Sequence, residues 1–312
     1  AANPSYFVYT GTLQSLGARV LAVPMDDDGM DVDAVERLLL GLKHDGRLGR
    51  VRFIYCTSFY QNPTGLTLSL PRRKRLLDIV RRFSTGHRIL IVEDAAYREL
   101  RYDGGALPSI KSFDPENRYT VLTQTFSKPF APGLKTGYTA MPRDLLEPVL
   151  HQKSNHDFGS THLAQQIVLE AMVSGLYHEH LTELRDAYRR KRNAMLDALD
   201  RYMPDHPEIG WTRPLGGLYV WLTLPQHVST SRCSALFGKC LDAGVLYVPG
   251  DYAYQPDEHG QIPRNHLRLS FGHVRLGQIE QGIQRLAAAI ESEMSASEAS
   301  VSGSQRCNPR SP

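Results

Sequence analysis

Residues 88–97 read RILIVEDAAY, in which four apolar residues are followed at once by two carboxylates, two alanines and a tyrosine. A continuous apolar run of this length is typical of a strand that is buried on both faces of a sheet. In open α/β sheets, ligands bind at the carboxyl ends of the strands. We therefore predict a strand over residues 88–93 and a functional position at Asp94, directly after it.

The sequence on either side of this strand alternates between strand and helix patterns. Further strands are predicted at residues 18–24, 51–57, 119–125 and 136–141. Helices are predicted at residues 32–42 and from Ser69 to about Phe83, because Ser69 suits an N-cap and Pro71 a first helical turn. This alternation predicts an α/β fold, whose large domain has a mostly parallel sheet with helices on both faces.

The second half of the chain follows a different pattern. Residues 144–202 read as helices, and the later segments read as strands at 217–224, 245–248 and 266–271 with helices at 235–243 and 276–291. These later elements predict a smaller C-terminal α+β domain. The predicted organisation is a large domain at 1–150, a helical connection at 151–202, a small domain at 203–292 and a polar, disordered tail at 293–312.

The composition is that of an ordinary globular protein, with 41% hydrophobic and 22% charged residues among 312. The formal net charge of +3 gives no reason to expect nucleic acid, and the Arg-rich stretches at 72–75 and 189–192 fit solvated helix faces. No apolar run approaches the roughly 20 residues of a membrane-spanning helix, and the first residues do not form a signal peptide. The cysteines and histidines show no metal-binding spacing, so we expect no metal and a cytoplasmic location.

Polar side chains follow three of the predicted strands. Asn62 lies in the turn after the first of them, and Asp94 and Tyr97 follow the second. Ser127 and Lys128 follow the third. Each of these has a simpler explanation, since Asn-Pro-Thr-Gly is usually a turn, an aspartate after a strand is usually an N-cap and a lone lysine is usually solvated. Together they predict an amide, a carboxylate, a phenol, a hydroxyl and an amine at one edge of the sheet.

With these motifs the sequence resembles the fold-type I pyridoxal-phosphate enzymes of the class I/II aminotransferase family. It is most similar to the branch that includes 2-aminoadipate and kynurenine aminotransferases and the aminotransferase-like domain of MocR regulators. The motifs occur in the family's order as NPTG at 62–65, EDAAY at 93–97, SK at 127–128 with Lys135 downstream, PLGGLYVW at 214–221 and RLSF at 268–271. The resemblance implies pyridoxal 5'-phosphate as cofactor, an amino acid and a 2-oxo acid as substrates, and a homodimer.

The resemblance also implies a role for each motif residue. Lys128 would bind the cofactor aldehyde covalently as an imine and, once displaced by the substrate, would move a proton. Asp94 would face the pyridine nitrogen and keep it protonated. The other cofactor contacts would come from Tyr6 against the ring face, Asn62 and Tyr97 at the phenolate oxygen, and Thr125, Ser127 and Lys135 at the phosphate.

Substrate binding is implied for two residues, Asn62 and Arg268. The guanidinium group of Arg268 would hold the substrate α-carboxylate, because its planar fork matches a carboxylate and a lysine would not. The alternative for Arg268 is an exposed strand arginine, but the flanking Leu267 and Leu269-Ser-Phe favour a binding role. The alternative for Tyr6, a tyrosine at a strand edge, is nearly as well supported by the sequence. The implied reaction is a ping-pong exchange of an amino group between the two substrates.

The chain departs from the family pattern in two places. Lys135 stands where the family usually has an arginine, so the phosphate would meet a point charge and not a fork. Family members also carry roughly one more βα unit ahead of the Pro-x-Tyr motif, with a Gly-Ser-Gln-type turn whose amides cradle the phosphate. The chain therefore resembles a family member without its front, as in a truncated product or a fragment, and we expect an exposed sheet edge.

Other functions use the same residues. A fold-type I lyase, decarboxylase or acyl-transferring synthase needs the same lysine and aspartate, and would release ammonia or CO2 where an aminotransferase forms glutamate from 2-oxoglutarate. A non-catalytic sensing domain like that of MocR regulators would bind the cofactor without turnover. An inert fragment would not bind it.

Overall fold

The computed structural model describes residues 1–257 and 259–304, which divide into two compact units. The first unit comprises Ala1–Ala187 and Pro214–Gly217, and the second comprises Tyr188–Arg213 and the chain from Leu218 onward. The boundary falls inside helix α6 (Leu176–Tyr202), whereas the sequence predicts boundaries near residues 150 and 202. The helical connection is thus divided between the units and is not a separate segment.

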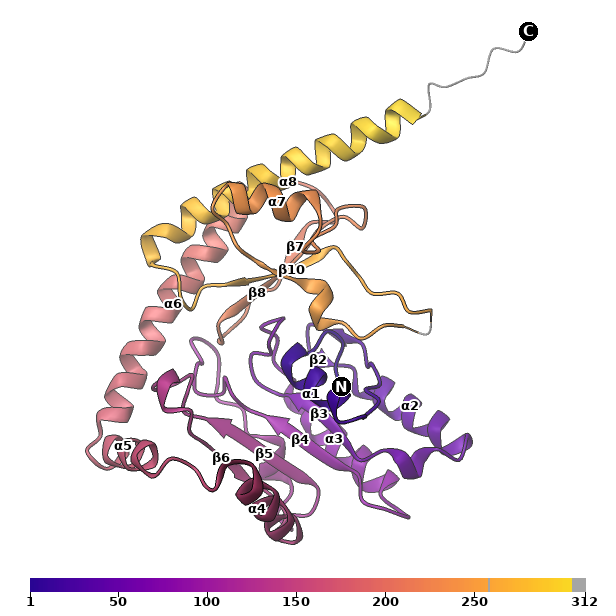
Figure 1. Cartoon of the computed structure of the whole chain (residues 1–312), viewed down its shortest axis with the longest axis vertical. Helices are drawn as coiled ribbons and strands as arrows, with labels where there is room; N and C mark the ends of the chain where they lie inside the picture. The colour runs from indigo at the N-terminus through magenta and orange to yellow at the C-terminus, as the bar shows by residue number, and fades with distance from the viewer. Residues whose placement is uncertain (258, 305–312) are drawn as a thin grey trace. The chain divides into compact units, whose positions relative to one another are not determined.

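A four-stranded sheet with the order β3–β4–β5–β6 organises the first unit in the described chain (Figure 1). Its strands are β3 (Phe53–Thr57), β4 (Leu90–Asp94), β5 (Thr120–Thr125) and β6 (Gly137–Ala140). The first three strands are parallel, and only β6 runs antiparallel. Thr57 lies opposite Asp94, and Asp94 lies opposite Thr123, so the parallel strands end together at one edge. The mostly parallel sheet predicted for this part of the chain is confirmed.

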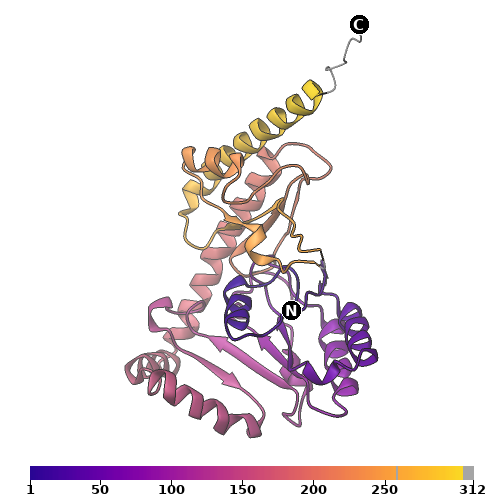
Figure 2. The ribbon, with the colours of Figure 1, turned by 45° about the vertical axis from the view of Figure 1, so that its right-hand side comes forward.

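Helices lie next to each of the two outer strands of this sheet, β3 and β6. Figures 1 and 2 show α2 (Val32–His44) and α3 (Leu70–Phe83) near β3, with α4 (Arg143–Asp157) and α5 (His162–Val173) near β6. The carboxylate of Asp31 caps α2 by accepting a hydrogen bond of 2.9 Å from the backbone N–H of Ala34. Ser69 is the N-cap residue of α3, and the buried side chains of α3 pack into the core of the first unit.

Several short elements complete the described part of the chain. Helix α1 (Phe7–Ser15) follows Tyr6, and the sequence did not predict it because its residues form no apolar stripe. A short antiparallel hairpin, β1 (Met25–Asp26) and β2 (Gly29–Met30), follows the segment at residues 18–24. The 3₁₀ helices are η1 (Leu48–Arg50), η2 (Ile110–Phe113), η3 (Pro132–Leu134) and η4 (Gly250–Ala253).

Two strand predictions need correction. The strand expected at residues 18–24 forms only an isolated parallel bridge between Ala2 and Val23, with one further bond from the Ala1 amine to the carbonyl oxygen of Leu21. A strand needs a continuous partner backbone, and the segment at residues 1–3 is too short to provide one. The β4 strand was expected to be buried on both faces. Ile91 and Glu93 are buried, but Leu90 and Val92 on the other face are half-buried.

The second unit is built on an antiparallel sheet with the order β7–β8–β10–β9 in the part that the structure describes. Its strands are β7 (Gly210–Trp211), β8 (Tyr219–Thr223), β9 (Val248–Pro249) and β10 (His266–Ser270). The helices α7 (Ala235–Asp242) and α8 (Leu276–Ser304) contact each other. The sequence predicts β8, β10, α7 and the start of α8, but it missed β7, and the strand expected at 245–248 is the shorter β9 at Val248–Pro249. The disordered tail expected from residue 293 is helical through Ser304, and residues 305–312 lie outside the described residues.

The segment Pro214–Gly217 groups with the first unit, although the sequence places it in the small domain. Gly216 forms a bridge with Arg101, and the backbone N–H of Gly217 donates to the carbonyl oxygen of Leu100 at 2.8 Å. A Cβ at Gly217 would lie 2.7 Å from Cβ of Tyr60, so the close approach needs glycine. Among the described residues, no helix is long and apolar enough to cross a membrane.

A buried histidine of the second unit makes stability depend on pH. His266 stacks on Trp221 with ring centroids 5.6 Å apart, and burial lowers its pKa from 6.5 to about 4. Between these values the unfolded chain binds a proton that the folded chain excludes. The free energy of unfolding should therefore fall as the pH falls from 6.5 to about 4, by about 3 kcal/mol from this group.

The variant His266→Phe keeps an aromatic ring against Trp221 and removes the titrating group. Urea unfolding of both proteins at several pH values measures the difference. We expect the wild type to lose more stability than the variant between pH 6.5 and 4. Equal losses in the two proteins would contradict the assignment.

Candidate active site

The loop after β3 carries Asn62 and is held by buried hydrogen bonds around Gln61. The side-chain oxygen of Gln61 accepts from the hydroxyl of Thr64 at 2.5 Å, and its side-chain amide donates to the carbonyl oxygen of Pro4 at 3.0 Å. Asn62 is only 4% exposed. Because Pro4 lies two residues before Tyr6, the second of these bonds joins the Tyr6 segment to the Asn62 loop.

At the end of β4, both oxygens of the Asp94 carboxylate accept hydrogen bonds. Oδ2 accepts from the phenol of Tyr55 at 2.7 Å, and Oδ1 accepts from the backbone N–H of Ala96 at 3.0 Å. The hydroxyl of Thr57 lies 3.3 Å from the Tyr55 phenol oxygen and donates to it. These contacts fix the orientation of the carboxylate. Sequence reasoning identified Asp94 but missed Tyr55, although two residues separate Tyr55 from Thr57 and put both on the same face as Asp94.

Two tyrosines stand close to the charge of Asp94. Burial, and then the negative charge of Asp94, raises the pKa of Tyr55 well above 10. The ring of Tyr9 packs on Tyr55 with centroids 4.2 Å apart, and burial together with the Asp94 charge also raises the pKa of Tyr9. Both phenols therefore stay protonated at neutral pH, so Tyr55 reaches Asp94 as a donor.

Lys128 and Tyr97 come from neighbouring strand ends and meet at the same edge. Lys128 is half-buried, and its Nζ lies 5.9 Å from the centroid of the Tyr97 ring. Tyr97 is 5% exposed, so its ring is a wall of the site and not a surface group. An ammonium over an aromatic face at this distance is electrostatically attracted to it.

The residues predicted to hold a phosphate lie on one closed loop. The backbone N–H of Phe126 donates to the carbonyl oxygen of Thr136 at 2.9 Å, which closes the loop at its base. The Thr125 hydroxyl accepts from the N–H of Ser127 at 3.0 Å and donates to the carbonyl oxygen of Thr136 at 3.3 Å, so it shapes the loop from within. Lys135 is exposed and adopts the left-handed conformation with φ of 50°.

Arg268 belongs to the second unit. It lies on β10 opposite Trp221 of β8, and its guanidinium carbon is 4.2 Å from the centroid of the Tyr219 ring. The Tyr219 ring covers one flat face of the guanidinium group, whose N–H groups donate from its edge. This is the geometry in which arginine binds a carboxylate through its fork.

A buried carboxylate next to Asp94 also fixes the site, and the sequence analysis did not single it out. Glu93 accepts from the Ser58 hydroxyl at 2.7 Å and from the backbone N–H of Ile110 at 2.9 Å through Oε1. Its Oε2 accepts from the N–H of Lys111 at 3.0 Å. Glu93 therefore joins β4 to the loop after β3 and to η2.

Arg73 of α3 completes this network. It is fully buried, and it donates to the carbonyl oxygens of Leu68, Pro108 and Ser58 at 2.9, 2.8 and 2.6 Å. Burial lowers its pKa, and the charge of Glu93 opposes that effect. The expectation that residues 72–75 form a solvated helix face is therefore wrong for Arg73. The sequence did hold a signal, because Arg73 lies three and four residues before two buried leucines of α3.

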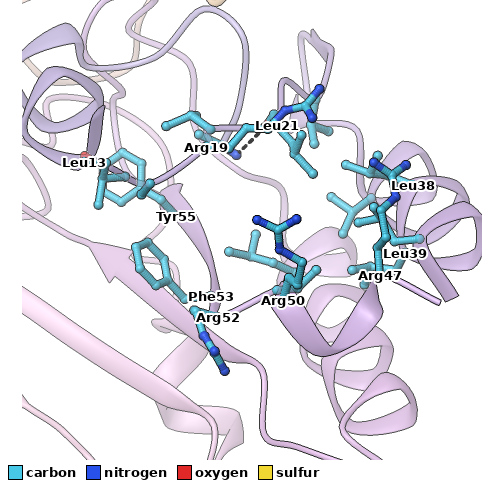
Figure 3. Close-up of a pocket in the computed structure, with 18 of the residues that line it drawn as sticks. Leu13, Arg19, Leu21, Leu38, Leu39, Arg47, Arg50, Arg52, Phe53 and Tyr55 are labelled. Carbon is cyan, nitrogen blue, oxygen red and sulfur yellow. Dashed lines mark hydrogen bonds between the residues drawn. The ribbon is translucent and has the colours of Figure 1, made fainter. Parts of the chain in front are cut away.

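A cavity of about 470 Å³ lies beside β3, between that strand and residues 18–23 (Figure 3). Apolar side chains of α2 and of residues 18–23 line it, together with the arginines Arg19, Arg47, Arg50 and Arg52. In the described chain, the predicted site residues are not part of its lining. Tyr55 is, so its ring faces the cavity while its hydroxyl binds Asp94.

Comparison with known proteins places this geometry in a family. The family model "Aminotransferase class I and II" matches residues 1–286. The chain is 34% identical over 291 residues to aromatic-amino-acid aminotransferase 1 of Thermococcus litoralis, covering 93% of this chain and 66% of that protein. It therefore spans just under two thirds of the length of this relative.

Solved structures agree with this assignment. The kynurenine aminotransferase of Pyrococcus horikoshii, in complex with PMP and with KYN and KYA, matches with a TM-score of 0.86 at 32% identity, over 94% of this chain and 69% of that one. The alpha-aminoadipate aminotransferase LysN of Thermus thermophilus, complexed with N-(5'-phosphopyridoxyl)-L-leucine, matches with a TM-score of 0.82 at 34% identity, over 95% and 71%. The predicted fold class and the family resemblance are confirmed.

A substitution at Arg73 tests whether the buried hydrogen bonds of Arg73 and Glu93 hold the strand ends in place. The variant Arg73→Met should lower the free energy of unfolding by about 3–5 kcal/mol, because it leaves three buried carbonyl groups and a buried carboxylate without their cation. Urea unfolding measures this loss.

Arg75→Met on the same helix is the control. Arg75 is 48% exposed and pairs with Glu36, so its loss should be about 1 kcal/mol or less. Similar losses for Arg73→Met and Arg75→Met would show that the network does not hold the site.

Proposed function

We propose a function for this chain from one premise: the chain belongs to the class I and II aminotransferase family. The proposed function is transamination between an amino acid and a 2-oxo acid with pyridoxal 5'-phosphate as cofactor. One observation carries the proposal. A carboxylate fixed by two hydrogen bonds and a half-buried amine lie at the ends of neighbouring parallel strands, at the edge where such sheets bind ligands.

The residues at this edge fit the cofactor's functional groups. Asp94 is an acceptor held in a fixed plane, as a protonated pyridine nitrogen requires. Asn62 and Tyr97 supply donors for the ring's phenolate oxygen, and Tyr6 supplies an aromatic face. Ser127 and Lys135 supply a hydroxyl and a cation for the phosphate, on the loop that Thr125 shapes. These assignments follow from the chemistry of the donor set.

When bound, pyridoxal 5'-phosphate draws electrons away from the amino acid's Cα through its protonated ring. The chain's own residues supply the rest. The amine of Lys128 would hold the cofactor and would move a proton at the substrate Cα. The charge of Asp94 would hold the ring nitrogen in its protonated form. The guanidinium fork of Arg268 has the shape and charge to bind the substrate α-carboxylate.

Transamination is favoured over a lyase, decarboxylase or synthase reaction by the relatives. The three matched proteins described above are all named as aminotransferases, at 32–34% identity. Their names include aromatic amino acids, kynurenine and α-aminoadipate, so an amino acid with a large side chain is the substrate class to test first. We also propose a cytoplasmic location, which the free thiols of Cys56, Cys233 and Cys240 support.

The variant Lys128→Ala tests the proposed catalytic amine. It should lower the rate of glutamate formation from an amino acid and 2-oxoglutarate by roughly 10³-fold, because proton transfer by a positioned group contributes about 10²–10⁴-fold. The visible absorbance of protein-bound cofactor should be lost as well.

Lys153→Ala is the control, since Lys153 is a partly exposed lysine of α4 that pairs with Asp157. It should leave both the rate and the absorbance unchanged. Release of ammonia or CO2 by the wild type, without glutamate, would overturn transamination in favour of the other reactions.

We further propose that the chain forms a homodimer through α4 and α5. Large apolar side chains stand exposed there, among them Phe158 at 97%, Val173 at 76% and Leu163 at 69%. Large apolar side chains that gather on an exposed surface mark an interaction site in a globular protein, which supports this proposal. A second copy of the chain is the partner that the family resemblance implies.

The variant Leu163→Asp tests this interface by adding a charge to α5. It should weaken dimerisation by about tenfold or more, because desolvating an unpaired carboxylate costs well over about 1.4 kcal/mol. Analytical ultracentrifugation over a range of concentrations measures the dissociation constant. Leu40→Asp on α2, where the leucine is 52% exposed, is the control and should not change it. A monomeric wild type would contradict the proposal.

A further inference from the structure

We propose that Tyr55 is a positioning residue that sets the orientation of Asp94 toward the cofactor ring, an inference that rests on the proposed function. Tyr55 lies in the middle of β3 and is 3% exposed. Its hydroxyl donates to Oδ2 of Asp94 at 2.7 Å. This is a contact between a buried phenol and the carboxylate that ends β4 at the candidate site.

The sheet register brings the two groups together. Thr57 is paired with Asp94 across β3 and β4, and Tyr55 lies two residues before Thr57 on the same face. A side chain as long as tyrosine reaches diagonally to the neighbouring strand, which a shorter one would not. The contact is therefore fixed by strand pairing and not by a mobile loop.

The direction of the hydrogen bond is also fixed. The titratable groups that face the Tyr55 phenol are Asp94 of β4 and Tyr9 of α1. The Thr57 hydroxyl donates to the phenol oxygen, which leaves the phenol proton for Asp94. Burial and the Asp94 charge raise the pKa of Tyr55 well above 10, so it remains a donor over the working pH range.

Replacing Tyr55 by phenylalanine would keep the packing of the ring and remove only the hydroxyl. The Tyr55 ring stacks on Tyr9 and borders the cavity next to Leu13, as Figure 3 shows. A phenylalanine would fill the same space. What it would remove is one of the two donors to the carboxylate, leaving only the backbone N–H of Ala96 on the opposite oxygen.

This loss has a defined chemical effect. A carboxylate with a donor on each oxygen has a fixed plane. Without Tyr55, the Asp94 carboxylate can rotate away from the orientation that faces the pyridine nitrogen. We expect weaker cofactor binding and a change in the spectrum of the bound cofactor, while the fold is kept.

The test is a double-mutant cycle between Tyr55→Phe and Asp94→Asn. Purified protein is stripped of cofactor and titrated with pyridoxal 5'-phosphate, and the dissociation constant is read from the visible absorbance. Tyr55→Phe should raise this constant about tenfold, the scale of a hydrogen bond to a charged group. In the Asp94→Asn background, the same substitution should have little further effect, because its target charge is absent.

Two further readouts separate positioning from a structural role. The pH dependence of the bound-cofactor absorbance should shift in Tyr55→Phe, and thermal unfolding of the cofactor-free variant should stay close to the wild type. Tyr9→Phe, which removes a hydroxyl from the ring stacked on Tyr55, is the matched control and should bind cofactor as the wild type does. Equal losses from Tyr55→Phe in both backgrounds would overturn the inference.

The failure of this inference is distinct from the failure of the proposed function. If Asp94→Asn weakens cofactor binding and Tyr55→Phe does not, only the role of Tyr55 is wrong. If Asp94→Asn binds as tightly as the wild type, or if the wild type binds no cofactor, the proposed function fails and the role of Tyr55 fails with it.

Discussion

Parallel pairing of β3, β4 and β5 is the constraint on which the candidate site depends. Because Thr57 is opposite Asp94 and Asp94 is opposite Thr123, the ends of these strands share one edge. Each strand then delivers a different group to that edge: an amide from the first loop, a carboxylate and a phenol from the second, and an amine from the third. A slip of one residue in either pairing would turn Asp94 to the other face.

The two adjacent carboxylates at the end of β4, Glu93 and Asp94, have different roles. Glu93 points into the core, where Ser58 and two backbone N–H groups satisfy it and buried Arg73 balances its charge. Asp94 points to the opposite face, where Tyr55 and Ala96 orient it. The first carboxylate holds the loops that surround the site, and the second is available to act on a ligand because those loops are held.

The sequence predicted what depends on local pattern. The parallel strands, the α2 and α3 helices and the order of polar groups after each strand follow from apolar runs, N-cap residues and turns. It could not predict what depends on distant partners. The segment at 18–24 reads as a strand but forms only an isolated bridge, between Val23 and Ala2, and Arg73 reads as solvated but lies on the buried stripe of α3. Tyr55 carried no motif, and only the register of β3 against β4 reveals its contact with Asp94.

The central claim is that Lys128 is the amine that holds the cofactor. Borohydride reduction of the protein after incubation with pyridoxal 5'-phosphate, followed by peptide mass mapping, tests it most directly, since reduction makes the lysine–cofactor link permanent. We predict a phosphopyridoxyl group on the peptide that contains Lys128. A label confined to other lysines, or no label at all, would contradict the account.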